Sequence, residues 1–335
     1  MNNEWGGYLP LEYTIKYNYK NVLFKTVDNR NIVRLNSARN AVCFLMELGR
    51  YNKIWIPLYM CLSIKESLEN YRIHFEYYSI DEEFFPNVES IPVGDVILIC
   101  NYFGLKGKDF YKKCMNRFSN IIFDNTQALF CEPIMGNNIF NIYSPRKFVG
   151  VSDGAFLVGS DLDVENGVVS KEIEKLSIDT SFERGNYLLK SSEISTNEAY
   201  DDYLKSEEKL GKEIRIMSRM TECLLGGIDY TRIESIRKNN YQKLKSKLDR
   251  YNELDLKECD RGPMCYPLLR SDDMLRKRLV DNNIYVPQWW KWIIGEKRAN
   301  NWEVKVSKWL YPIPIDQRYT EDEMDELAER IIDLL

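Results

Sequence analysis

Two residues that could carry nucleophilic and proton-transfer chemistry follow consecutive apolar runs in the middle of the chain. In NIIFDNTQAL (120–129) a β-type run ends at Asp124, and Gln127 follows one turn later. The next β-type run delivers Ser144 and then Lys147. Taken singly, an Asp after a strand is most often a turn residue, and a Lys between strands is most often solvated. Together they predict an amine and a carboxylate at one edge of a sheet.

The composition limits which residues can move protons. His74 is the single histidine of the chain, so a mechanism with a histidine base or a histidine-rich metal site is not favoured. Proton transfer therefore falls to Lys, Asp, Glu, Tyr or Cys. The eight cysteines contain no Cys-x-x-Cys pair, and several lie in apolar segments where a thiol behaves as a small hydrophobe. We expect reduced cysteines, a cytoplasmic location and no metal.

A second feature that could bind a ligand is RLNSARNAV (34–42). Here a β-type run ends and Ser37 can cap a helix whose first amides, at Ala38 and Arg39, are free. Such an end binds an anion through its N–H groups and the helix dipole. For Ser37 alone, an ordinary N-cap is the simpler interpretation. The chain contains neither a G-x-G-x-x-G fingerprint nor a Walker loop.

The first half of the chain alternates β-type and helical patterns. Crossover units of this kind predict a mainly parallel sheet with helices on both faces, which binds ligands beyond the carboxyl ends of its strands. The predicted strands are 31–35, 53–57, 73–80, 95–102, 120–124, 138–144 and 154–159. The predicted helices are 37–48, 62–71 and 109–118.

The second half has a different pattern. Residues 160–200 are polar and predict an excursion or substrate loop. We expect residues 1–227 to form a large α/β domain and residues 228–335 a smaller α+β domain. The elements predicted after residue 196 are helices at 197–225 and 230–254, a strand at 264–269, a helix at 272–282, an aromatic loop at 287–292, a strand at 309–313 and a last helix that starts with the capping box of Thr320 and Glu323.

Charge and hydropathy exclude several classes of function. The 335 residues carry a net charge of −5, which repels phosphate backbones and acidic membranes. No run reaches about 18 apolar residues, and the N-terminal segment lacks a basic region followed by an apolar stretch. We therefore expect neither nucleic acid nor membrane as a partner.

Five segments, in this order and spacing, resemble the DegT/DnrJ/EryC1/StrS family of pyridoxal-phosphate sugar aminotransferases, which have the aspartate aminotransferase fold (type I). An amine, a carboxylate and a phosphate-binding helix start are what this cofactor requires of a protein. The segments are NSARNAV (36–42), WIPLYMCLSI (55–64), CNYFG (100–104), FDNTQAL (123–129) and SPRKFVGVSDGAFLV (144–158).

The resemblance implies catalytic roles for Lys147 and Asp124 and a cofactor-binding role for Gln127. Lys147 would bind pyridoxal 5'-phosphate as a Schiff base and then act as the base. Asp124 would pair with the pyridine nitrogen and keep it protonated, since an ion pair is strong in a low-dielectric site. Gln127 would lie beside the ring and its 3-oxygen.

The resemblance also implies a phosphate site and a stacking residue. Ser144 and Ser37, with the amides of Ala38 and Arg39, would hold the phosphate, and Tyr59 would stack on the ring. Two positions depart from the family's pattern. Ile142 stands where the family has a serine five residues before the lysine, and Gly154-Ala155 stands where it often has Gly-Gly.

The resemblance implies a homodimer with the active site at the interface, acting in surface polysaccharide or amino-sugar biosynthesis. The expected reaction transfers an amino group from an amino acid, glutamate, to a keto sugar that is linked to a nucleotide. Two alternatives on the same fold are a sugar dehydratase, in which the family's lysine is replaced by histidine, and a binding homologue without catalysis. The segment PQWWKW (287–292) would either stack on a sugar face or pack in a core or interface.

Overall fold

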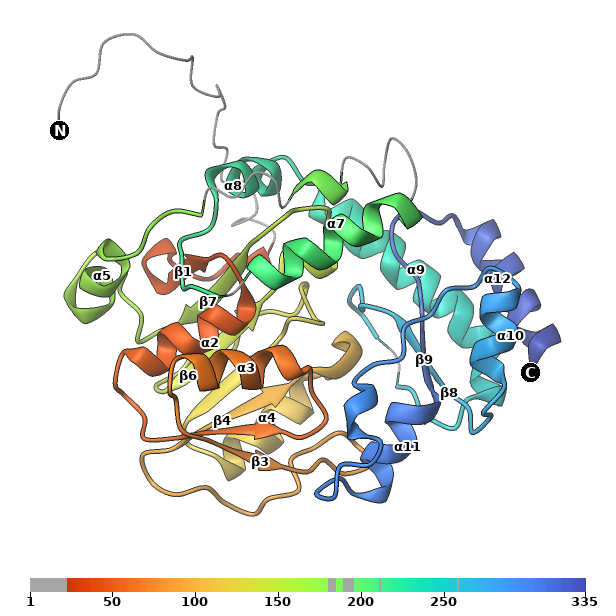
Figure 1. Cartoon of the computed structure of the whole chain (residues 1–335), viewed down its shortest axis with the longest axis horizontal. Helices are drawn as coiled ribbons and strands as arrows, with labels where there is room; N and C mark the ends of the chain where they lie inside the picture. The colour runs from red at the N-terminus through yellow and green to blue at the C-terminus, as the bar shows by residue number, and fades with distance from the viewer. Residues whose placement is uncertain (1–22, 180–184, 189–195, 211, 258) are drawn as a thin grey trace, which may run out of the picture.

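The computed structural model describes residues 23–179, 185–188, 196–210, 212–257 and 259–335. Its main sheet has seven strands and lies in the left part of the view in Figure 1. The strands follow the order β1-β7-β6-β5-β4-β2-β3 across the sheet. Their bounds are β1 Ile32–Leu35, β2 Ile54–Pro57, β3 Phe75–Tyr78, β4 Val96–Cys100, β5 Ile121–Asp124, β6 Ile139–Tyr143 and β7 Ala155–Gly159.

The directions of the strands bring the ends of β4, β5 and β6, which carry the predicted site residues, together. Within this sheet β7 is antiparallel to both of its neighbours, β1 and β6, and every other neighbouring pair is parallel. In the register of the ladder Cys100 pairs with Asp124, and Asp124 pairs with Ile142. The carboxyl ends of β4, β5 and β6 therefore lie side by side, at the edge where this type of sheet binds ligands.

Helices cover the sheet and continue into the second half of the chain. The helix α2 packs against β1, β6 and β7 with Ala41, Cys43 and Leu45 fully buried. The helix bounds are α2 Ala38–Glu47, α3 Leu62–Asn70, α4 Lys108–Arg117, α5 Gly167–Glu174, α7 Thr196–Lys209, α8 Arg219–Gly226, α9 Tyr230–Leu248, α10 Leu275–Asp281, α11 Asn301–Trp309 and α12 Glu321–Leu334.

A separate apolar core lies at the end of the molecule opposite α5 (Figure 1). There the antiparallel strands β8 (Tyr266–Leu269) and β9 (Leu310–Ile313) pack with α9, α10 and α12. The predicted capping box is present at the start of α12, where Thr320 Oγ1 accepts from the Glu323 amide at 3.3 Å and the Glu323 carboxylate accepts from the Thr320 amide at 2.7 Å. The division into domains at residue 227 stays a prediction.

Three elements differ from the sequence prediction. The helical pattern predicted over 197–225 is interrupted between α7 and α8, because Ile216 in this stretch forms isolated β-bridges to Leu35 and Ile178. The predicted excursion at 160–200 contains the short helix α5, although parts of it lie outside the described residues. The helix α11 is additional, and it begins with a capping box between Asn300 and Glu303.

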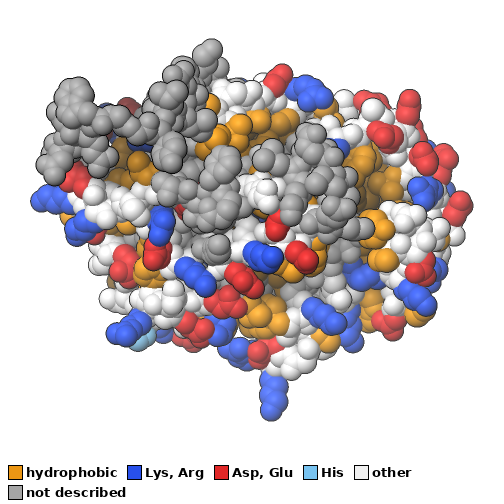
Figure 2. All heavy atoms as spheres, turned by 45° about the horizontal axis from the view of Figure 1, so that its top comes forward, with side chains coloured by type: hydrophobic (Ala, Val, Ile, Leu, Met, Phe, Trp, Pro, Cys, Tyr) orange, Lys and Arg blue, Asp and Glu red, His pale blue; other side chains and the backbone are white. Residues whose placement is uncertain are grey.

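The surface carries charges of both signs. Figure 2 shows basic and acidic side chains interspersed among the described residues of one face. Among the described residues, none of the helices combines the length and apolar character that a bilayer crossing requires.

Candidate active site

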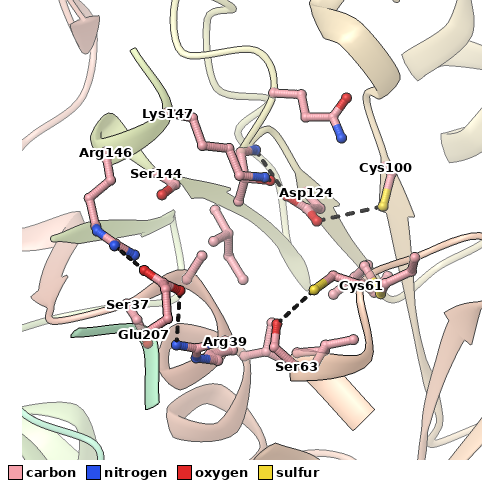
Figure 3. Close-up of a pocket in the computed structure, with 18 of the residues that line it drawn as sticks. Ser37, Arg39, Cys61, Ser63, Cys100, Asp124, Ser144, Arg146, Lys147 and Glu207 are labelled. Atoms are coloured by element: carbon pink, nitrogen blue, oxygen red, sulfur yellow. Dashed lines mark hydrogen bonds and ion pairs between the residues drawn. The ribbon is translucent and has the colours of Figure 1, made fainter. Parts of the chain in front are cut away.

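A cavity of about 340 Å³ lies beyond the carboxyl ends of β4, β5 and β6 and at the amino end of α2 (Figure 3). Seven of the eight predicted site residues line this cavity: Ser37, Ala38, Arg39, Asp124, Gln127, Ser144 and Lys147. Sheet topology therefore brings together side chains from three separate parts of the sequence.

Asp124 ends β5, and two donors hold its carboxylate. Its Oδ1 accepts from the backbone amide of Thr126 at 2.9 Å, and its Oδ2 accepts from Cys100 Sγ at 3.5 Å. Burial, followed by the nearby Asp124 carboxylate, raises the pKa of the Cys100 thiol well above its ordinary value. The thiol therefore stays protonated and acts as a donor, which fixes the orientation of the carboxylate.

Lys147 ends the single 3-10 turn η3 (Pro145–Lys147) that follows β6. Its Nζ donates to Thr126 Oγ1 at 2.9 Å, and the residue as a whole is exposed, so a ligand can reach the amine. Thr126 thus connects the two predicted catalytic residues: its hydroxyl accepts from Lys147, and its backbone amide donates to Asp124. The sequence pattern does not identify Thr126, although this residue lies between Asp124 and Gln127 in FDNTQAL (123–129).

Gln127 lies beside this pair and is buried. Its Oε1 accepts from the Phe103 backbone amide at 2.7 Å. This bond fixes which way the amide group points, so its NH₂ remains to donate to a group in the cavity.

The amino end of α2 forms the opposite side of the cavity. Ser37 caps the helix, and its Oγ accepts from the Asn40 amide at 3.3 Å. The ordinary N-cap interpretation of Ser37 is therefore correct, and the first helical residues, Ala38 and Arg39, line the cavity as well. Asn36 and Asn40 anchor this end, since both side chains donate to the Glu213 carbonyl, at 3.1 and 2.6 Å.

Two arginines meet one carboxylate inside the cavity (Figure 3). Arg146 Nη2 pairs with Glu207 Oε1, and Arg39 Nη2 lies 3.7 Å from Glu207 Oε2. Burial alone would lower the pKa of Arg146, but Glu207 and Tyr187 outweigh it and the pKa is raised. Sequence reasoning missed Arg146, which adjoins Lys147, and Glu207, which lies on α7 with no local signal.

The structure corrects the expectation for Tyr59. Its side chain does not line the cavity; it is fully buried and packs edge-on against Trp290, with ring centroids 4.4 Å apart. Met60 and Cys61 from the same segment line the cavity instead, together with Trp290. The chain bends directly after β2, so the side chain of Tyr59 enters the core rather than the site.

We predict that Tyr59→Phe leaves ligand binding unchanged and stabilises the fold by about 1 kcal/mol. The Tyr59 hydroxyl is buried and has no hydrogen-bond partner among the described residues, so its removal ends an uncompensated desolvation cost. Urea unfolding measures the change. Tyr102→Phe is the matched control and should lose about 1 kcal/mol, because the Tyr102 hydroxyl donates to the Tyr59 carbonyl at 2.8 Å. An equal loss in both variants would contradict this prediction.

The tryptophan-rich segment 287–292 forms a wall beside the site. Trp290 lines the cavity, Trp289 stacks on Phe103 with centroids 5.8 Å apart, and Trp292 Nε1 donates to the Met60 carbonyl at 3.0 Å. Two of the three indoles therefore pack within the protein, and one is in contact with the cavity.

Comparisons with known proteins agree on the architecture. No protein-family model matches the sequence, and no curated protein matches it. Among solved structures, S. venezuelae DesV, in complex with a ketimine intermediate, superposes with a TM-score of 0.65 at 13% identity over 95% of this chain and 87% of that chain. A DegT DnrJ EryC1 StrS aminotransferase from Brucella abortus superposes with a TM-score of 0.62 at 12% identity over 95% and 88%. The chain has the fold of the DegT-type sugar aminotransferases.

This DegT-type fold confirms the class predicted from the sequence, an α/β fold of type I with a mainly parallel sheet. The same fold also includes an enzyme of the alternative reaction class. The GDP-4-keto-6-deoxymannose-3-dehydratase ColD superposes with a TM-score of 0.64 at 13% identity over 95% of this chain and 91% of that chain. The fold alone therefore leaves the reaction to be argued from the site.

Proposed function

We propose that this chain is an aminotransferase that uses pyridoxal phosphate to move an amino group from an amino acid to a keto sugar. The observation that carries the proposal is the pairing of an amine and a carboxylate in one cavity. Lys147 and Asp124 are joined there through Thr126, and the cavity ends at the amino end of α2.

The residues around the cavity fit this cofactor. Lys147 offers a primary amine for its aldehyde, and Asp124 offers a carboxylate for its pyridine nitrogen. Ser144, Ser37 and the first amides of α2 offer donors for its phosphate. When bound, pyridoxal phosphate supplies an aldehyde that exchanges amines and a protonated ring that withdraws electrons from the substrate carbon.

Lys147 performs two tasks in this proposal. Its Nζ attaches the cofactor, and the hydrogen bond to Thr126 Oγ1 at 2.9 Å holds the amine toward the carboxyl end of β5. The same nitrogen then takes up and returns the proton of the substrate carbon. No histidine is needed for this transfer, and His74 is exposed and does not line the cavity.

Asp124 stabilises positive charge at the pyridine nitrogen. Both carboxylate oxygens already accept hydrogen bonds, from Thr126 and Cys100, so the group is fixed before a ligand arrives. A preorganised charge of this kind favours the charged state without reorganisation during the reaction.

The finer assignments rest on the resemblance and on the related structures. We propose glutamate as the amino donor and a nucleotide-linked keto sugar as the acceptor. We propose a homodimer with the active site at the interface, which sedimentation of the purified protein tests. We propose the cytoplasm as the location, because a reducing compartment suits the buried thiols of Cys43, Cys100, Cys114, Cys259 and Cys265.

A dehydratase, ColD, is among the solved structures that share this fold. The resemblance implies that such dehydratases replace the cofactor lysine with histidine. Lys147 occupies that position in this chain, which favours aminotransfer.

A spectroscopic titration tests the proposal. Purified protein equilibrated with pyridoxal phosphate should retain it through dialysis and show a near-visible band. Glutamate should bleach the band, and a nucleotide-linked keto sugar should restore it. A protein that does not retain the cofactor would be a binding homologue without this chemistry. A band that amino donors leave unchanged would contradict aminotransfer.

A further inference from the structure

The Glu207 carboxylate lies where a ligand anion would bind. It comes from α7, yet it lies inside the cavity between two guanidinium groups, Arg146 from the turn after β6 and Arg39 from α2 (Figure 3). The Glu207 side chain is 29% exposed, whereas the side chains of Arg146 and Arg39 are 15% and 16% exposed. The carboxylate therefore reaches into a cationic site from its open side.

Glu207 does not satisfy all the hydrogen-bond donors of this site. Arg146 Nη2 pairs with one carboxylate oxygen, and Tyr187 also interacts with this guanidinium. Arg146 Nε is nevertheless buried and has no hydrogen-bond partner among the described residues. A guanidinium binds an anion best through two parallel N–H groups, which requires two suitably placed oxygens. The unpartnered Nε therefore points to a ligand with more acceptor oxygens than Glu207 presents here.

The charges lead to the same conclusion. The Lys147 amine and the Asp124 carboxylate in the same cavity offset one another. At the amino end of α2, which contributes about +0.5, the two guanidiniums face the Glu207 carboxylate, and Arg39 Nη2 also donates to the Leu210 carbonyl at 2.5 Å. A phosphate monoester carries about −1.5 to −2 and three acceptor oxygens, and it matches this set better than one carboxylate does. Ser37 and Ser144 line the same cavity and add hydroxyl donors.

Arg146 also compensates for a missing donor. Ile142 lines the cavity at the position where the resemblance expects a serine, and its side chain cannot hydrogen-bond. Arg146, four residues later on the same segment, provides charged N–H groups to the cavity instead.

We infer that Arg146 and Arg39 form a site for a phosphate monoester and that Glu207 is an internal competitor which the phosphate displaces. In the proposed function this phosphate is the phosphate of the cofactor, so its identity rests on that function. The presence of the anion site itself does not depend on the reaction.

Titration calorimetry of the 335-residue chain, stripped of cofactor, with inorganic phosphate as the probe tests the inference. Glu207→Gln keeps the size of the side chain and removes its charge, so phosphate should bind about fivefold more tightly. The matched control is Glu208→Gln, because Glu208 is the exposed neighbour and does not line the cavity. It should bind phosphate as the unaltered chain does. Unchanged or weaker binding in Glu207→Gln would overturn the inference.

Two further arms separate the possible outcomes. Arg146→Met keeps the apolar part of the side chain and should weaken phosphate binding at least tenfold. The unfolding midpoint of this variant verifies that it is folded. Undiminished phosphate binding would show that Arg146 is not part of the site. The variants should rank in the same order of affinity for pyridoxal 5'-phosphate as for inorganic phosphate. Pyridoxal lacks the phosphate, so it should bind Glu207→Gln and the unaltered chain with the same affinity. Phosphate responses without any retention of pyridoxal 5'-phosphate would uphold the anion site and contradict the proposed function.

Discussion

Lys147→Ala is expected to lose turnover by about 10⁴-fold or more, together with the near-visible band of the bound cofactor. The loss is large because one nitrogen both attaches the cofactor and moves the proton. Both carboxylates that line the cavity are engaged, Asp124 by two hydrogen-bond donors and Glu207 by Arg146. Absorbance spectra and steady-state rates of the variant measure both effects.

Lys112→Ala provides the matched control for this variant. Lys112 is an exposed lysine on α4 and does not line the cavity. Its removal should leave the band and the rate unchanged. A normal band in Lys147→Ala would show that another group binds the cofactor.

Asp124→Asn is expected to keep the cofactor and to lower turnover by about 10²–10³-fold. The amide has the shape of the carboxylate and can still accept the hydrogen bond from the Thr126 amide. It lacks the negative charge that keeps the pyridine nitrogen protonated, so the ring withdraws electrons less well. A fall in kcat with little change in cofactor retention is the expected result.

Asp95→Asn is the control, because it removes the charge of a carboxylate that lies outside the cavity. Asp95 is buried and lies just before β4, at the end of this strand opposite Cys100 and the cavity, where Oδ2 accepts from Trp55 Nε1 at 2.9 Å. This variant should keep full activity per folded molecule. If Asp124→Asn behaved like Asp95→Asn, the charge of Asp124 would have no catalytic role.

The strand ends of the site could be predicted from the sequence because they depend on local patterns. The apolar run 121–123 ends at Asp124, and residues 139–143 lead to Ser144 and Lys147 in the same way. Parallel strands then bring these ends to one edge without further information. The capping signal at Ser37 is local as well, and it places the amino end of α2 correctly.

Other features depend on tertiary structure that no local pattern records. Glu207 meets Arg146 across 61 residues of sequence, so neither residue shows its partner. The direction of Tyr59 is set by the bend after β2, where strand alternation no longer applies. The helices α5 and α11 escaped prediction because both are short and contain β-branched residues, Val168-Val169 in one and Val304 and Val306 in the other.

Borohydride reduction followed by peptide mass mapping tests the central claim most directly. Protein loaded with pyridoxal phosphate is reduced, digested and analysed for the peptide that carries the added mass. The account predicts a single modified peptide, with the cofactor fixed to the nitrogen of Lys147. Attachment at another lysine, or an unmodified Lys147 in fully loaded protein, would contradict it.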